Sequence, residues 1–173
     1  RDSLPVMTTL GVTTLISDSG VTRYRVNTEE WMMYDRKKPS YWAFEKGVYM
    51  EQFDSIFNVE ASIKADTAYY YDKERLWKLI GNVDIQNRKG ERFNTELLYW
   101  NEATQKVYSD KFIRIQQPDR IITGHGFDSN QQMTIYTIRN IEGIFYVDEE
   151  ASSGPPQPET KALPDSVNKD TAK

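Results

Sequence analysis

His125 is the only histidine of the chain, and it is the first residue to test for chemistry. A zinc site or a Ser-His-Asp arrangement would need partner residues. The chain has no second histidine and no cysteine, and it lacks a G-x-S-x-G motif. His125 lies between Gly124 and Gly126. The sequence therefore favours an ordinary histidine at the surface or on an edge strand, beside the glycines of a β-bulge.

Carboxylates are the second group that could do chemistry, because a pair of them can cleave a glycosidic bond. Asp54, Asp66, Asp72 and Asp84 each stand next to an expected turn or on the polar face of an expected strand. Solvated faces explain these positions more simply than catalysis does. There is also no P-loop and no dinucleotide-binding loop. We therefore predict no catalytic residue, no metal site, no cofactor and no enzymatic activity.

The composition narrows the class of partner. The 173 residues carry a formal net charge of −4, which argues against a nucleic-acid partner because a phosphate backbone requires a basic face. No stretch is long and apolar enough to span a bilayer. The sequence begins with Arg1, so we expect a trimmed or processed chain from which any signal peptide or membrane anchor is absent.

The stretch from residue 65 to residue 127 alternates between apolar and polar side chains, which is the period of half-buried strands. Two breaks divide it, at residues 87–90 and 101–104. The first begins with Asn87 and ends with Gly90, which suits a hairpin turn because glycine accepts a positive φ. With 13% aromatic residues, among them 11 tyrosines, the composition also favours β structure.

The same stretch contains a repeat. Tyr70-Tyr71-Asp72 and the later Val83-x-Ile85 match Tyr99-Trp100-Asn101 and the later Ile113-x-Ile115, at an offset of 29 to 30 residues. Residues 28–35 are a fainter copy. A short repeat of strand and turn predicts hairpin units stacked along an axis. The alternative is that aromatic-rich strands resemble one another by chance.

The remaining segments read as follows. Strands are expected at residues 12–16, 21–26, 57–65 and 133–138, and residues 27–36 are expected to be a strand, with a capped helix as the alternative. A turn is expected at residues 128–130, and a break at 140–143 before a short final strand at 144–147. From residue 149 onward the chain is rich in Pro, Ser, Lys and Asp. We therefore predict one domain at residues 1–148 and a disordered tail at 149–173.

Alternation places one row of side chains between the predicted sheets. The row either fills an ordinary core or lines an open groove for an apolar ligand, and composition does not separate the two. As candidate groove residues we take Trp77, Leu79, Val83, Ile85, Phe93, Leu97, Tyr99, Val107, Ile113 and Ile115.

The strand expected at residues 133–138 is the last well-formed one, and it carries no charge. Its apolar residues are Met133, Ile135 and Ile138. An edge strand without Pro or charge invites pairing with another chain. We therefore predict that these residues form a partner edge, with the alternative that residues 144–147 or the tail fold back and cover it.

Short motifs, taken in their order and spacing, resemble the OstA-like family and most closely its LptC group. The resemblance covers about residues 15–143. The motifs are Ser17-Asp18-Ser19-Gly20, Phe44-x-x-Gly47-Val48, Ala65-x-x-Ala68-x-Tyr70, Gly81-Asn82-Val83-x-Ile85, Gly90-x-x-Phe93-x-Thr95-x-x-Leu98-x-Trp100 and Ile122-Thr123-Gly124-x-Gly126-Phe127.

The resemblance implies an all-β fold, an open twisted β-jelly roll of two antiparallel sheets. It also implies a periplasmic protein, tethered to the inner membrane by an N-terminal segment outside this sequence. Such a protein would bind lipopolysaccharide and pass it from the inner-membrane ABC transporter to the periplasmic bridge protein LptA. The alternatives are an LptA-like soluble bridge protein of the same fold, or a polysaccharide-processing enzyme or adhesion module on a β scaffold.

Overall fold

The computed structural model describes residues 3–18 and 21–147, and the described part is all-β, as predicted. The predicted tail at 149–173 lies outside the described residues. The strands are β1 (Met7–Asp18), β2 (Val21–Tyr34), β3 (Tyr41–Phe44), β4 (Val48–Phe53), β5 (Val59–Ala65), β6 (Thr67–Tyr71), β7 (Leu76–Asn87), β8 (Arg92–Asn101), β9 (Lys106–Gln116), β10 (Arg120–Asn130) and β11 (Tyr136–Tyr146). No described helix is both long and apolar enough to cross a membrane.

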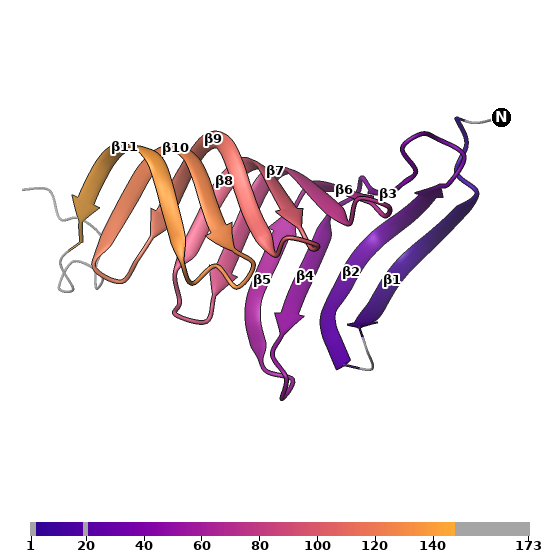
Figure 1. The fold of residues 1–173 in the computed structure, drawn as a ribbon, viewed down its shortest axis with the longest axis horizontal. Coiled ribbons are helices and arrows are strands. Elements are labelled where there is room, and N and C mark those ends of the chain that lie inside the picture. Colours follow the sequence, from indigo (N-terminus) through magenta and orange to yellow (C-terminus); the bar gives the residue numbers. More distant parts are fainter. Residues whose placement is uncertain (1–2, 19–20, 148–173) are drawn as a thin grey trace, which may run out of the picture.

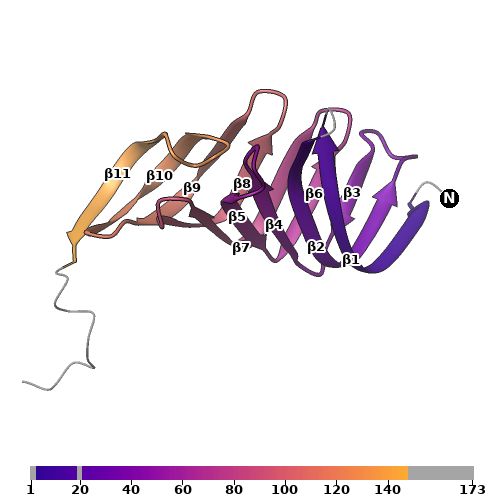
Figure 2. The ribbon, with the colours of Figure 1, turned by 90° about the horizontal axis from the view of Figure 1, so that it is seen from below.

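All eleven strands belong to one antiparallel sheet that folds over on itself into a roll of two layers. β1 and β11 lie at opposite ends of the molecule (Figures 1 and 2). Between β2 and β7 the layers are built from different strands. β4 and β5 join these two strands in one layer, and β3 and β6 join them in the other.

The long strands β7 to β11 pass through both layers. In what we call layer A, the paired segments are residues 24–28, 48–53, 59–65, 83–87, 92–95, 112–116, 120–124 and 141–146. In layer B they are residues 32–34, 41–44, 67–71, 76–80, 97–101, 106–109, 127–130 and 136–138. Figure 1 shows these strands arching from one layer to the other.

Irregularities in register mark where the strands bend. The register between β7 and β8 shifts between Ile80 and Val83, where Gly81 and Asn82 both have a positive φ. Further shifts lie between Thr95 and Tyr99 in β8 and on both sides of His125 in β10. A bulge bends a strand and increases its twist. The aligned bulges therefore form one side of the roll, and the turns between strands form the other, which we call the seam.

Several expected boundaries are confirmed and others are wrong. The turns at 87–90 and 101–104 are present, and residues 27–34 are strand, not helix. Residues 128–130 do not turn but end β10, and the turn follows at 131–135. Residues 140–143 do not break the chain, because a shift in register lets β11 continue past Gly143.

Candidate functional site

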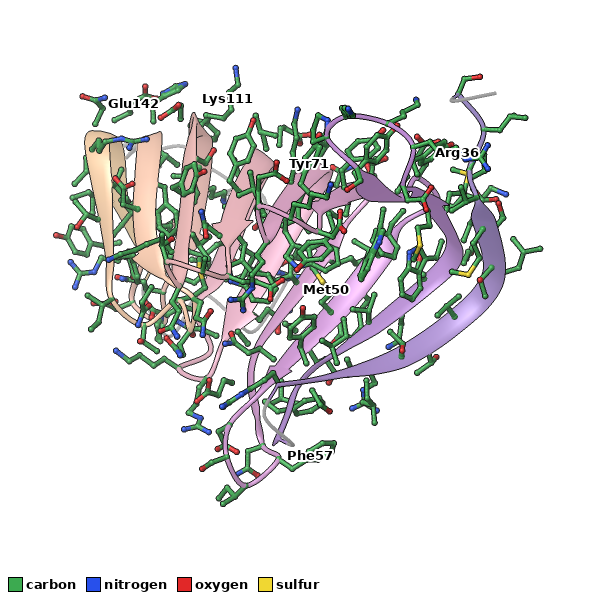
Figure 3. The ribbon with its side chains drawn as sticks, turned by 45° about the vertical axis from the view of Figure 1, so that its right-hand side comes forward. Arg36, Met50, Phe57, Tyr71, Lys111 and Glu142 are labelled. Atoms are coloured by element: carbon green, nitrogen blue, oxygen red, sulfur yellow. The ribbon has the colours of Figure 1, made fainter. Side chains whose placement is uncertain are left out.

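The space between the layers is the main candidate site, and its centre is filled by side chains. Eight of the ten candidate groove residues are at most 1% exposed, namely Trp77, Leu79, Val83, Ile85, Phe93, Val107, Ile113 and Ile115. They form one apolar cluster with Phe44, Met50 and Phe127. Figure 3 shows Met50 between the layers, whereas Lys111 and Glu142 point outward. In this structure the middle of the roll is thus a packed core.

The inward orientation predicted for Leu97 and Tyr99 is wrong. Their neighbours Leu98 and Trp100 are buried at 0% and 4% exposure, whereas Leu97 and Tyr99 are half-buried. Tyr99 stacks against Tyr108 with ring centroids 5.3 Å apart. The bulge in β8 inserts one extra residue, so the side chains after it point to the opposite face from the one that strict alternation predicts.

An open cavity of about 520 Å³ lies between the layers, from the ends of β1 and β2 to the turns that follow β8 and β10. Its volume falls within the range of small-molecule sites, about 300–1,000 Å³. We call it the mouth. Most of its lining is polar and includes Arg23, Arg75 and Glu102. An apolar part comes from Ile16, Tyr24, Phe53, Trp42, Tyr70 and Trp100.

Aromatic contacts continue from the mouth into the core. Trp42 packs on Tyr70 at 4.9 Å, and Tyr70 packs on Trp77 at 4.6 Å between ring centroids. Tyr24 of layer A meets Trp100 of layer B edge-on at 5.4 Å. Such pairs stabilise a packed arrangement beyond the area that they bury. The mouth therefore opens onto an unbroken aromatic surface that leads into the core.

Glu102 ties the two layers together at the mouth. Its side chain is 12% exposed, and its Oε1 accepts hydrogen bonds from Trp77 Nε1 at 2.9 Å and from the Tyr24 hydroxyl at 3.1 Å. Burial, followed by the charge of Glu102, raises the pKa of both Tyr24 and Tyr70 above the usual value for tyrosine. Both phenols are therefore neutral at physiological pH.

A second carboxylate closes the seam farther along the roll. Glu91, only 7% exposed, accepts hydrogen bonds from Asn87 at 2.9 Å, from Gln117 at 3.0 Å and from the hydroxyl of Tyr136. Burial, followed by the bond to Glu91, raises the pKa of Tyr136 to about 12. Asn87 also donates to the carbonyl oxygen of Met133 at 2.8 Å. Here the turns of layer A bind the turn and strand of layer B.

The partner edge predicted at residues 133–138 overlaps β11, which ends the strand order, but the residues proposed for the edge need correction. Met133 lies in the turn before β11 and is 1% exposed, so it is not an edge residue. Ile138 packs against the core, and Ile135, at 77% exposure, precedes the strand. The exposed apolar residues of the edge are instead Ile141, Ile144, Phe145 and Tyr146 of β11, followed by Val147. At the other end, β1 exposes Met7, Leu10 and Leu15.

The histidine and the aspartate first considered as catalytic residues make hydrogen bonds and ion pairs that stabilise local structure. His125 is exposed at a bulge and pairs through Nδ1 with Glu142. Asp54 accepts three bonds from Asn58 and Ile56 and one from Arg88, and the backbone bond from Asn58 contributes most to lowering its pKa. In residues 3–18 and 21–147, no three His, Cys, Asp or Glu side chains are grouped to hold a metal ion.

Sequence reasoning missed the residues that close the seam. Glu102 and Gln117 stand in polar turns, where a solvated residue is the usual expectation. Glu91 follows Gly90 in a hairpin and gives no local sign of burial. Tyr70 and Trp100 could have been found from the aromatic repeat, because they pair with Trp77 from either side.

Comparisons with known proteins agree with this geometry. The family model described as "Lipopolysaccharide-assembly, LptC-related" matches residues 11–145, from within β1 to near the end of β11. A search of curated proteins finds no match. The family match covers well over half of the chain, and the all-β roll is the fold that the motifs implied. The chain therefore belongs to the LptC-related family of lipopolysaccharide-assembly proteins.

Proposed function

We propose that this protein binds lipopolysaccharide by its acyl chains and passes it from an inner-membrane ABC transporter to the periplasmic bridge protein LptA. The observation that carries the proposal is the mouth, an opening of about 520 Å³ between the two layers with aromatic side chains among its mostly polar lining. Membership of a lipopolysaccharide-assembly family supports lipopolysaccharide as the proposed cargo.

The physical argument is that the roll buries the apolar acyl chains of the lipid and leaves its charged head group in water. Each buried methylene group contributes about 0.8 kcal/mol, so an acyl chain gains by lying against Trp42, Tyr70 and Trp100. The phosphates of lipopolysaccharide are anionic, and the chain carries a net charge of −4. The head group is therefore held outside the roll, in water.

The two unpaired edges among the described strands, β1 and β11, supply the docking surfaces of this proposal. Both expose apolar side chains, and neither contains proline. Such edges suit strand addition, in which backbone hydrogen bonds give affinity and alternate side chains give register. In this proposal β1 meets the transporter and β11 meets LptA, in the periplasm, with an N-terminal tether to the inner membrane.

Site-specific photocrosslinking in cells that make lipopolysaccharide tests the cargo. A photoreactive residue at Trp42 or Trp100 is expected to form an adduct with lipopolysaccharide. The matched control is Tyr99, which lies next to Trp100 in sequence but on the outer face. Adducts at Tyr99 with none at Trp42 or Trp100 would place the cargo outside the roll and contradict the proposal.

A further inference from the structure

The turn between β10 and β11, residues 131–135, inserts one side chain into the core of the roll. Met133 is 1% exposed, whereas Ile135, two residues later in the same turn, is 77% exposed. Met133 also has a φ of +59°, in the left-handed region that is unfavourable for a residue with a side chain. Other contacts must therefore hold Met133 in this conformation.

Side-chain hydrogen bonds supply that support. Within the turn, the Asn130 carboxamide oxygen accepts from the backbone N–H groups of Thr134 at 2.9 Å and Ile135 at 3.1 Å. Across the seam, Asn87 donates to the Met133 carbonyl at 2.8 Å. The turn is thus shaped by its own residues and attached to layer A by a side chain.

The Glu91 carboxylate completes this attachment. It accepts from Asn87 and Gln117 in layer A and from the Tyr136 hydroxyl at the start of β11. Tyr136 in turn packs edge-on against Phe93 with ring centroids 5.1 Å apart. Because these bonds across the seam come from side chains, the turn can leave layer A while β10 and β11 stay paired.

We propose that Met133 is a built-in plug that occupies the part of the interior next to β10 and β11, where an acyl chain would otherwise lie, and that Glu91 holds the plug in place. The plug rests on the proposed function. A methionine side chain is unbranched, flexible and apolar, so it resembles an alkyl chain more closely than other core residues do. The roll is then open at the mouth and closed near β11 until cargo displaces the turn.

The open cavity and the plug meet at the turn of residues 131–135. Glu102 lies beside the open cavity of about 520 Å³, whose lining reaches Gln131 and Gln132 of that turn. Near β11, Glu91 lies beside a buried methionine in the packed core. Cargo that occupies the mouth therefore meets Met133 before it reaches the β11 edge.

Binding of 11-(dansylamino)undecanoic acid to the full chain tests the plug. Met133→Gly removes the side chain at a φ that glycine adopts freely, and Glu91→Gln weakens the attachment while keeping Met133. We expect Met133→Gly to bind the probe about tenfold more tightly than wild type, because burial of one methionine side chain no longer competes with it. Glu91→Gln is expected to increase the rate of probe association.

Ile135→Gly is the matched control, because it removes an exposed apolar side chain from the same turn. It is expected to bind the probe as wild type does. Thermal melts show which variants remain folded, and Glu91→Gln decides the test if Met133→Gly does not fold. Probe binding that is equal in wild type and in every folded variant would overturn the plug.

Lipopolysaccharide binding, measured separately with the same proteins, distinguishes the two proposals. Tighter probe binding in Met133→Gly with no lipopolysaccharide bound by any protein would support the plug and contradict the proposed cargo. Lipopolysaccharide binding that is unchanged by both substitutions, together with unchanged probe binding, would support the cargo and overturn the plug.

Discussion

The indole N–H of Trp77 donates a 2.9 Å hydrogen bond to Oε1 of Glu102 from a side chain that is 0% exposed. Trp77 lies in β7, and Glu102 lies in the turn after β8. The Tyr24 hydroxyl, from the opposite layer, reaches the same oxygen. One carboxylate in a turn therefore satisfies the polar atom of the largest core residue and joins the two layers.

Removal of this carboxylate is expected to destabilise the roll. Glu102→Ala leaves the Trp77 N–H and the Tyr24 hydroxyl without an acceptor, at roughly 1–3 kcal/mol for each unsatisfied group. Glu102→Gln is the matched control, because its amide oxygen can still accept from both donors. Urea denaturation measures the difference. Equal free energies of unfolding for the two variants would show that the hydrogen bonds contribute nothing.

Substitutions of the adjacent residues Leu97 and Leu98 test which of them the bulge in β8 directs into the core. Leu98→Asp places a charge in the packed core and is expected to cost several kcal/mol of stability or to prevent folding. Leu97→Asp changes a half-buried residue on the outer face, and we expect a loss of less than about 1 kcal/mol. Denaturation midpoints of the two variants provide the measurement, and the reverse order would mean that the register is wrong.

Proline substitutions in β11 test strand addition at its free edge. The Val147 N–H bonds to the Asp119 carbonyl, so alternation directs the Phe145 N–H toward β10 and the Ile144 N–H outward. Ile144→Pro is therefore expected to weaken binding of LptA, the proposed partner, while the melting temperature changes little. Phe145→Pro is the matched control, and it is expected to lower the melting temperature because it breaks a bond within the sheet. Undiminished LptA binding by Ile144→Pro would argue against this edge.

Alkaline pH is expected to weaken the closed seam. Burial and Glu91 raise the pKa of Tyr136 to about 12, whereas tyrosine in an unfolded chain titrates near pH 10. The folded state therefore binds the phenol proton more tightly than the unfolded state does. This contribution to stability is complete below about pH 10 and is lost as the pH rises to about 12.

Free energies of unfolding measured between pH 9 and about pH 12 check this expectation. Tyr136→Phe carries no titrating group at this position, so its stability should fall less steeply than that of wild type. Tyr24 and Tyr70 remain in both proteins and supply the shared part of the slope. Parallel profiles for the two proteins would show that Tyr136 is not coupled to folding.

The sequence predicted the strands and most of the core because alternation is a local signal. Alternation correctly predicted that Trp77 and Leu79 point into the core, because β7 is regular at these residues. It failed at Leu97 and Tyr99 because the bulge in β8 depends on how β9 pairs with it, and no residue type marks that step. The same limit applies to Gly143, where the glycine marks a bulge and not the end of the strand.

The candidate site was harder to predict than the fold. Burial of Glu91 and Met133 depends on contacts between residues 45 and 46 positions apart in sequence, namely Glu91 with Tyr136 and Asn87 with Met133. No local pattern encodes such a contact. Met133 in particular looked like the start of an edge strand, because an apolar residue between polar neighbours has the same appearance in a strand and in a buried turn.

The continuous backbone of β7 to β11 has a topological consequence for a cargo with a large polar part. The layers are covalently joined along the bulged side, and along the seam only side chains and turns meet. Under the proposed function, a lipid held by its acyl chains would therefore leave sideways through the seam, and its polar part would not be threaded through an enclosed ring of strands. The length of a sugar chain attached outside would then place no limit on what the roll can carry.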